Sequence, residues 1–143
     1  MGLLIINYPL IIPLYGIGGP VVNEYGQTGM RLMDEMWKVV KGQGLKNKGI
    51  NHWVYEDKTR MFVGVELESP PTGAGLEYKE VRLNAYARGK HIGPYSQLHS
   101  TNLALQQELK SRDIKWHYPQ LEIYGHWDAD ETKLETDILF SID

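Results

Sequence analysis

The 143-residue chain contains no cysteine. This absence excludes disulfides, thiolate nucleophiles, iron–sulfur clusters and zinc sites built on cysteine. Sites built from His and carboxylates stay open, but none of the five histidines shows the spacing of a metal ligand. We therefore expect no metal and no cofactor, and a cysteine-free chain is consistent with a cytoplasmic location.

Positive charge is scarce as well. Lys and Arg number 15 against 18 Asp and Glu, which leaves a net charge of −3. A protein that binds a phosphate backbone relies on an excess of Lys and Arg. The strand-like residues that open the chain also leave no room for a helix-turn-helix before them. We expect no direct binding to nucleic acid.

Long hydrophobic runs are absent too. The most apolar stretch is Leu3–Ile17, and Asn7, Pro9 and Pro13 interrupt it. A membrane-spanning helix needs about 20 consecutive apolar residues, and a signal peptide begins with basic residues that this stretch lacks. Because proline removes a ladder hydrogen bond, we predict an edge or bulged strand here and no membrane interaction.

Signatures of nucleotide and hydrolase sites are also missing. Gly16–Pro20 lacks the third glycine of a dinucleotide-binding loop. No P-loop, no Gly-x-Ser-x-Gly and no His-Glu-x-x-His occurs in the chain. The composition that remains, 42% hydrophobic and 23% charged, is typical of a folded protein. At this length we predict a single domain over residues 1–143.

The first half of the chain reads as strand, helix and hairpin. After the first strand and a loop over residues 16–29, apolar residues recur with a helical period from Met30 and end near Gly42. Residues 51–68 form two β-rich runs around a short polar loop, which is typical of a hairpin. The Pro/Gly-rich residues 69–75 cannot continue a strand, so we predict a linker there.

The same order of elements returns after this linker. Residues 81–88 alternate between apolar and polar, residues 96–112 carry a helical apolar stripe, and residues 121–127 and 134–142 read as a second hairpin. We predict an α+β fold made by tandem duplication of a βαββ unit, with an antiparallel sheet and pseudo-two-fold symmetry. The predicted half-repeats are about 1–70 and 76–143.

Two helices cover only one face of such a sheet. Leu121 and Ile123 suit the face under the helices, which leaves Glu122 and Tyr124 on the opposite face. The sequence therefore predicts a ligand cleft on the sheet face away from the helices.

Aromatic side chains gather on the predicted strands. In the repeat, Trp53 and Tyr55 occupy the positions that match Glu122 and Tyr124. Ring faces attract cations, and a carboxylate balances the positive charge of a ligand. Alternatively, the rings pack the core, and Glu122 is a solvated carboxylate or pairs with Arg82 or Arg88. On the residues alone, both interpretations stay open.

Three segments in the second half carry a family resemblance. His91–Tyr95 reads His-Ile-Gly-Pro-Tyr, Pro119–Tyr124 contains Glu-Ile-Tyr, and Glu135–Ile142 closes the chain with Thr-x-Ile-x-x-x-Ile. In this order they resemble the gyrase-inhibitory-protein-like (GyrI-like) small-molecule-binding family, which includes the effector-binding domain of multidrug-responsive bacterial transcription activators. The resemblance covers the whole chain and is looser in the first half, where Val63–Glu66 agrees.

The resemblance implies two βαββ units around a pseudo-two-fold axis, with a ligand cleft on the sheet face away from the helices. It also implies that Glu122, in the Glu-Ile-Tyr strand, faces lipophilic cations among aromatic side chains. Position and repeat symmetry add the expected wall residues, which are Tyr124, Tyr55, Trp53, Tyr86 and Tyr95.

We therefore predict a stand-alone protein that binds a lipophilic, aromatic or cationic small molecule around Glu122. Some stand-alone family members resemble hydrolases that open a strained cyclopropane ring in DNA-alkylating natural products. For that chemistry Glu122 would activate a water, a tyrosine hydroxyl would polarise the ligand, and Glu66 would supply a second carboxylate. A third alternative is an interaction module whose partner is gyrase or a separate transcription regulator.

Overall fold

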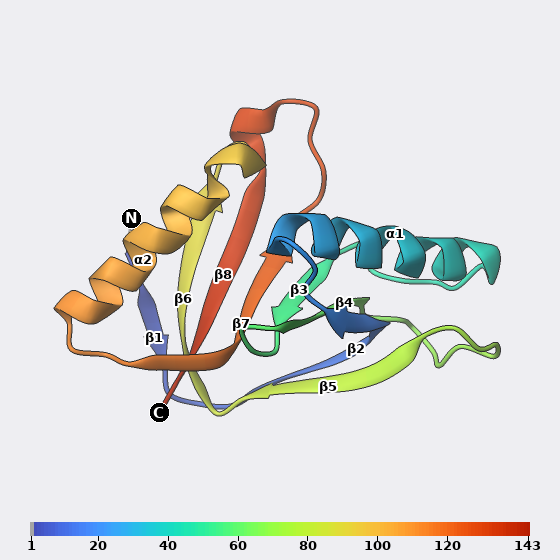
Figure 1. Ribbon diagram of the computed structural model, residues 1–143, viewed down its shortest axis with the longest axis horizontal. Helices are drawn as coiled ribbons and strands as arrows, with labels where there is room; N and C mark the ends of the chain where they lie inside the picture. The colour runs from blue at the N-terminus through green and yellow to red at the C-terminus, as the bar shows by residue number, and fades with distance from the viewer. Residues whose placement is uncertain (1) are drawn as a thin grey trace.

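The computed structural model describes residues 2–143 (Figure 1). Within these residues the chain forms eight strands, two α-helices and two short 3₁₀ helices, so the α+β prediction is confirmed. In chain order the elements are β1 (Leu4–Ile6), β2 (Leu10–Pro20), α1 (Tyr25–Gly42), β3 (His52–Tyr55), β4 (Arg60–Val65), β5 (Glu77–Leu83), β6 (Ala85–Ile92), η1 (Tyr95–Gln97), α2 (Leu98–Ser111), β7 (Trp116–Tyr124), η2 (Glu131–Lys133) and β8 (Glu135–Ile142).

All the strands belong to one antiparallel sheet with the order β1-β6-β8-β7-β3-β4-β2-β5. The order is symmetric. If β1 to β4 trade places with their counterparts β5 to β8, the same order is obtained in the opposite direction. The repeating unit is therefore ββαββ, one strand longer at its start than the βαββ unit predicted from the sequence. The first strand of each unit pairs with the other unit, and the pseudo-two-fold axis lies between the central strands β3 and β7.

The stretch predicted as one edge or bulged strand forms two strands: β1 lies at an edge of the sheet, as predicted, whereas β2 lies inside it. β2 pairs with β4 through Tyr15–Pro20 and with β5 through Leu10–Gly16. Pro13 lies in the part of β2 that has a partner strand on one side only, and this arrangement is how an internal strand tolerates proline. β2 also extends to Pro20 and so includes residues that were predicted to be loop.

Residues 81–88, predicted as one strand, belong to two. Asn84 separates β5 from β6, and these strands lie near opposite ends of the sheet order. The direct connection between them therefore ties the two ends of the sheet together. In Figure 1, β6 and β8 run steeply, whereas β2 and β5 run across the picture, so the sheet bends strongly.

Both helices pack on one face of the sheet. Antiparallel partners share a face, and Val63 is paired with Trp53, which is paired with Glu122. Glu122 is in turn paired with Ile138. Val63 packs in a core cluster with residues of α1, and Ile138 packs in a cluster with residues of α2. Glu122 therefore lies on the face that the helices cover.

The opposite face has a core of its own, because the bend brings both halves of the sheet together there. This core includes Val54 from β3, Leu121 from β7 and Leu139 from β8, together with buried side chains from β2 and β5. The predicted facing of the last hairpin is therefore wrong. Leu121 points away from the helices, and Glu122 points toward them. Within residues 2–143, no helix is long and apolar enough to cross a membrane.

Candidate ligand-binding cavity

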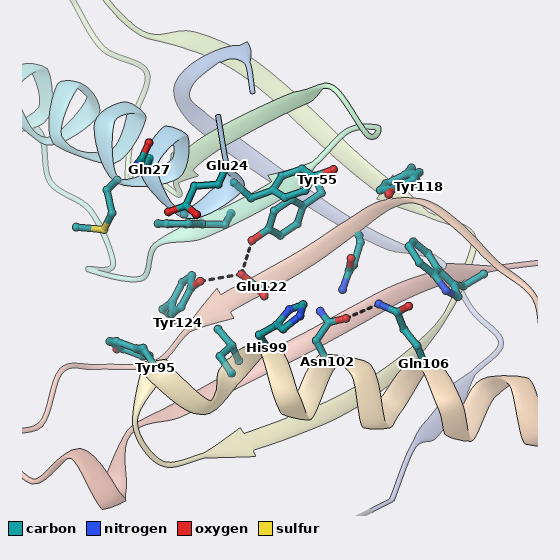
Figure 2. A pocket seen from close by; sticks show the side chains of 17 residues that line it. Glu24, Gln27, Tyr55, Tyr95, His99, Asn102, Gln106, Tyr118, Glu122 and Tyr124 are labelled. Atoms are coloured by element: carbon teal, nitrogen blue, oxygen red, sulfur yellow. Dashed lines mark hydrogen bonds between the residues drawn. The ribbon is translucent and has the colours of Figure 1, made fainter. Parts of the chain in front are cut away.

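A cavity of about 900 Å³ lies between the two helices (Figure 2). β3 and β7 form its floor, the first turns of α1 form one wall, and η1 and α2 form the other. Its volume lies within the range of small-molecule sites, about 300 to 1,000 Å³.

The position of this cavity corrects the predicted cleft on the face away from the helices. α1 packs over β2 and β4, and α2 packs over β6. The central strands β3 and β7 are therefore left uncovered between the helices, on the face that the helices share. The centre of the far face is filled by the core of the bent sheet, which includes Val54 and Leu121 of the same two strands.

Glu122 is a buried carboxylate held by two tyrosines. The Tyr55 hydroxyl donates to Glu122 Oε1 at 2.6 Å, and the Tyr124 hydroxyl donates to the same oxygen at 2.8 Å (Figure 2). The side chain is 6% exposed. Oε2 accepts no hydrogen bond from any group within residues 2–143, so it is the oxygen left for a ligand.

The protonation of Glu122 is set by competing effects. Burial raises the pKa of Glu122 above its ordinary value, while the hydrogen bonds from Tyr55 and Tyr124 and the nearby His99 act to lower it. Burial is the largest effect, so the net shift is upward. A cation beside the carboxylate would favour the ionised form and would lower this pKa again.

Both tyrosine partners stay protonated and remain donors. Burial raises the pKa of Tyr55 and of Tyr124, and the neighbouring Glu122 carboxylate raises both further. The two hydroxyl groups therefore hold Oε1 in place across the whole range of pH in which Glu122 ionises.

Aromatic rings continue outward from this carboxylate. The Tyr124 ring meets Trp53 and Tyr95 edge to face, each with ring centroids 5.4 Å apart, and Tyr55 meets Tyr25 at 5.5 Å. Such pairs stiffen one another. Trp53 is 7% exposed, whereas Tyr95 is 42% exposed. The rings therefore run from a buried floor to the mouth of the cavity.

One side of α2 contributes polar groups. His99, Asn102 and Gln106 lie on the face of the helix that lines the cavity (Figure 2), and Gln106 Nε2 donates to Asn102 Oδ1 at 2.6 Å. From the floor, Gln120 on β7 also lines the cavity, and it is 7% exposed. Two buried donors of the lining, Trp53 Nε1 and Gln120 Nε2, have no hydrogen-bond partner within residues 2–143.

The charges of the lining have one sign. Glu24, at the start of α1, and Glu122 line the cavity, and no Lys or Arg of residues 2–143 does so. His99 is the one further residue of the lining that can carry a positive charge. No group of three His, Asp or Glu side chains within residues 2–143 is placed to hold a metal ion.

The structure brings five of the predicted site residues together and separates two. Glu122, Tyr124, Tyr55, Trp53 and Tyr95 all line the cavity. The two that do not are Tyr86, which packs in the core of the far face, and Glu66, which follows β4 and forms an ion pair with Lys48.

The break at Asn84 explains the wrong position of Tyr86. On an unbroken strand Tyr86 would face away from Val81 and Leu83, but the break brings it into the same core as these residues. Glu66 does not line the cavity because it faces away from the helices. Val65 and Trp53 lie on the face that the helices cover, and Glu66, which follows Val65, points to the opposite face.

The lining residues that the helices contribute are not among the predicted site residues. α1 begins at Tyr25 and not near Met30, so Glu24 and Tyr25 lie at the start of a helix and not in the predicted loop. On α2, His99, Asn102 and Gln106 are spaced three and four residues apart, which places them on one face of a helix. That polar stripe, next to the apolar stripe, was the signal that could have found this wall.

No protein-family model matches this chain, and no curated protein matches its sequence. Solved structures match in fold. The C-terminal domain of EcmrR has a TM-score of 0.74 and 15% identity, covering 99% of this chain and 96% of that one. In an EcmrR–DNA complex, the TM-score is 0.71 at 16% identity, and the match covers 99% of this chain but 56% of EcmrR.

Two further structures extend the comparison. SAV2435 bound to tetraphenylphosphonium has a TM-score of 0.67 and 15% identity, covering 100% of this chain and 94% of that one. A hydrolase from Listeria innocua has a TM-score of 0.53 and 13% identity, covering 96% and 92%. At such identities the likeness establishes the fold and not the function. The chain has the GyrI-like fold that its sequence motifs predicted.

Proposed function

We propose that this protein binds a lipophilic, aromatic cation in the cavity between its helices, with the positive charge next to Glu122. The observation that carries the proposal is a buried carboxylate whose Oε1 is held by two tyrosines while Oε2 accepts no hydrogen bond within residues 2–143. Burial disfavours the ionised carboxylate, and the positive charge of a ligand offsets this cost.

The surroundings of Glu122 support a cation over other ligands. Trp53, Tyr55 and Tyr124 offer ring faces and edges around the carboxylate, and aromatic faces attract cations. The absence of Lys and Arg from the lining within residues 2–143 removes the groups that would hold an anion. The fold neighbour SAV2435 was solved with tetraphenylphosphonium, a lipophilic cation.

Thermal unfolding with a small ligand panel tests the proposal. The panel contains tetraphenylphosphonium and neutral triphenylphosphine oxide, tested on wild type and on Glu122→Gln. A ligand that binds only the folded state adds about 2.7 kcal/mol at about 100 times its Kd. We expect tetraphenylphosphonium to raise the Tm of wild type by several degrees and to have a much smaller effect on Glu122→Gln.

Glu80→Gln is the matched control, because Glu80 is exposed on β5 and does not line the cavity. It should respond to tetraphenylphosphonium as wild type does. A shift of equal size in wild type and Glu122→Gln would contradict the proposal, and so would a larger response to the neutral ligand than to the cation.

A second candidate function is hydrolysis of a strained, reactive ligand. Burial raises the pKa of Glu122, and a raised pKa makes the ionised carboxylate a stronger general base. In this reaction Glu122 takes a proton from water, and the oxygen attacks a cyclopropane carbon. The ring bond breaks, its electron pair moves onto a conjugated carbonyl oxygen, and Tyr95 donates the proton that neutralises it. One fold neighbour is a hydrolase.

Mass spectrometry separates the two functions. Incubation with a cyclopropane-bearing alkylator followed by recovery of the ligand shows whether one water has been added. Hydrolysis predicts the heavier product with wild type and not with Glu122→Gln, because a base acts mainly in the transition state. Recovery of intact ligand from wild type, together with a thermal shift, would leave binding as the function.

A further inference from the structure

The cavity has a second end that the cation does not explain. Tyr95 of η1 and His99 of α2 lie at the end of the cavity that holds Glu122 and Tyr124, whereas Gln106 and Tyr118 lie toward the opposite end, on different walls (Figure 2). Between these ends, the side-chain amides of Asn102 and Gln120 approach the cavity from its wall and from its floor. Aromatic rings line both ends, but the carboxylate of Glu122 belongs to one end and the neutral amides to the other.

Gln120 is the informative residue of this amide end. Its side chain is 7% exposed, and its Nε2 donor has no hydrogen-bond partner within residues 2–143. Buried donors are almost always paired, because an unpaired one gives up its hydrogen bonds to water without replacement. Because Gln120 lines the cavity, a ligand that packs against its side chain would supply the partner that this buried donor lacks.

The neighbouring amides do not satisfy this donor. Asn102 Oδ1, on the α2 wall, accepts from Gln106 Nε2 at 2.6 Å and not from Gln120 Nε2. Gln120 also cannot leave the cavity side of the strand, because it is paired with Tyr55 on β3 and with Phe140 on β8. The geometry thus holds a donor in the floor of the cavity.

The distance from Gln120 to Glu122 fixes the spacing of the ligand's groups. Residues two apart on a strand face the same side and lie about 6.6 Å apart along it. This distance is close to the length of a para-substituted phenyl ring with its two substituent bonds. A flat ligand that lies along β7 would therefore reach both residues at once.

We propose that Gln120 forms a second recognition subsite, which takes a neutral oxygen acceptor of the ligand, and that the ligand is an elongated aromatic cation with a carbonyl oxygen about one ring away from its charge. This inference rests on the proposed binding of a cation at Glu122. The acceptor is neutral because no Lys or Arg within residues 2–143 lines the cavity to balance an anion.

A matched pair of cations tests the subsite. (4-Benzoylbenzyl)trimethylammonium carries a ketone one ring from its charge, and (4-benzylbenzyl)trimethylammonium has a methylene in place of the ketone. Calorimetric titration of wild type should give at least about fivefold tighter binding of the ketone, since one hydrogen bond to a buried donor is at stake. In Gln120→Met, which keeps the length of the side chain and removes the donor, this preference should fall below about twofold.

Gln107→Met is the matched control, because Gln107 is exposed on α2 and lies outside this cavity. It should keep the full preference for the ketone. A second readout needs no variant. The carbonyl stretch of the bound, ¹³C-labelled ketone should move to lower wavenumber in wild type, as a hydrogen-bonded ketone does. An unshifted stretch, or a preference that persists in Gln120→Met, would overturn the subsite.

Different results would overturn the Gln120 subsite and the cation site at Glu122. Equal binding of both cations by wild type, with Glu122→Gln weakening both, would overturn the subsite and leave the cation site intact. Absence of Glu122-dependent binding for either cation would overturn the proposed function and the subsite with it.

Discussion

At the scale of single residues, Glu122 is a group whose ionisation the fold opposes. Burial raises its pKa above the ordinary value of 4.5, although the two tyrosines act to lower it. The folded state therefore binds the proton more tightly than the unfolded chain, so the free energy of unfolding falls as the pH rises from the ordinary pKa through the raised one. We expect wild type to lose stability relative to Glu122→Gln over this range.

Differential scanning calorimetry from about pH 4 to about pH 8 measures this difference, because the window begins near the ordinary carboxyl pKa and extends in the direction of the shift. Near the lower limit the two proteins should melt at similar temperatures, and Glu122→Gln should become the more stable one as the pH rises. Glu80→Gln, with its exposed carboxylate, should show no such trend relative to wild type. A constant gap between wild type and Glu122→Gln across the range would contradict the buried carboxylate.

Tyr55 gives a second test at this scale. Tyr55→Phe removes the 2.6 Å hydrogen bond to Glu122 and leaves the ring in place. Hydrogen bonds to charged groups contribute about 1.5–3 kcal/mol, so we expect a loss of this size in urea unfolding above the pKa of Glu122 and a smaller loss below it. Tyr8→Phe is the control, since Tyr8 is 66% exposed. Losses of equal size at both pH values would show that the hydroxyl does not support the ionised carboxylate.

The sequence could predict part of the site at this scale. Glu122 and Tyr124 are two residues apart on a strand, which is enough to place them on one face. The sequence could not predict which face carries the helices, because both faces of this sheet are apolar. Leu121 and Ile123 suit a helix-covered face as well as they suit the core that the bend creates.

At the scale of elements, the close approach of α1 to the sheet depends on Gly29. A Cβ at this position would lie 2.2 Å from the Trp53 ring, which is part of the cavity floor. We expect Gly29→Ala to destabilise the protein by about 1–3 kcal/mol, because overpacking forces the helix or the ring to move. It should also weaken ligand binding, since the ring that moves lines the cavity. Urea unfolding and calorimetric titration measure the two effects.

Gly42→Ala is the control for this substitution. Gly42 lies at the end of the same helix, and a Cβ there would meet nothing within 4 Å. Alanine is the better helix former by about 1 kcal/mol, so Gly42→Ala should be neutral or stabilising and should leave binding unchanged. If Gly29→Ala behaved like Gly42→Ala in both assays, the tight contact between α1 and Trp53 would be wrong.

Sequence periodicity predicted the helices and hairpins well and their ends less well. The buried stripe of Leu98, Leu105 and Leu109 is the one that the pattern predicted for α2. The break between β5 and β6 was not predicted, because apolar and polar residues continue to alternate across Asn84. The strand ends there because the residues before Asn84 pair with β2 and the residues after it pair with β8. Such long-range pairing is not visible in the local sequence.

At the scale of the whole molecule, the duplication places the cavity where the two halves meet. The floor combines β3 from the first unit with β7 from the second, and each unit supplies one helical wall. The sequence predicted the duplication, since each half repeats the same order of elements. It could not predict the position of the cavity, which depends on how far apart the two helices lie across the central strands.

In the proposed complex, the ionised carboxylate of Glu122 holds the ligand cation. Calorimetric titration with tetraphenylphosphonium, near pH 6 and in two buffers of different ionisation enthalpy, tests this contact most directly. Because the cation favours the ionised carboxylate, wild type should release protons on binding, and Glu122→Gln should bind at least about tenfold more weakly and release none. Equal affinity in the two proteins, with no proton release from wild type, would contradict the account.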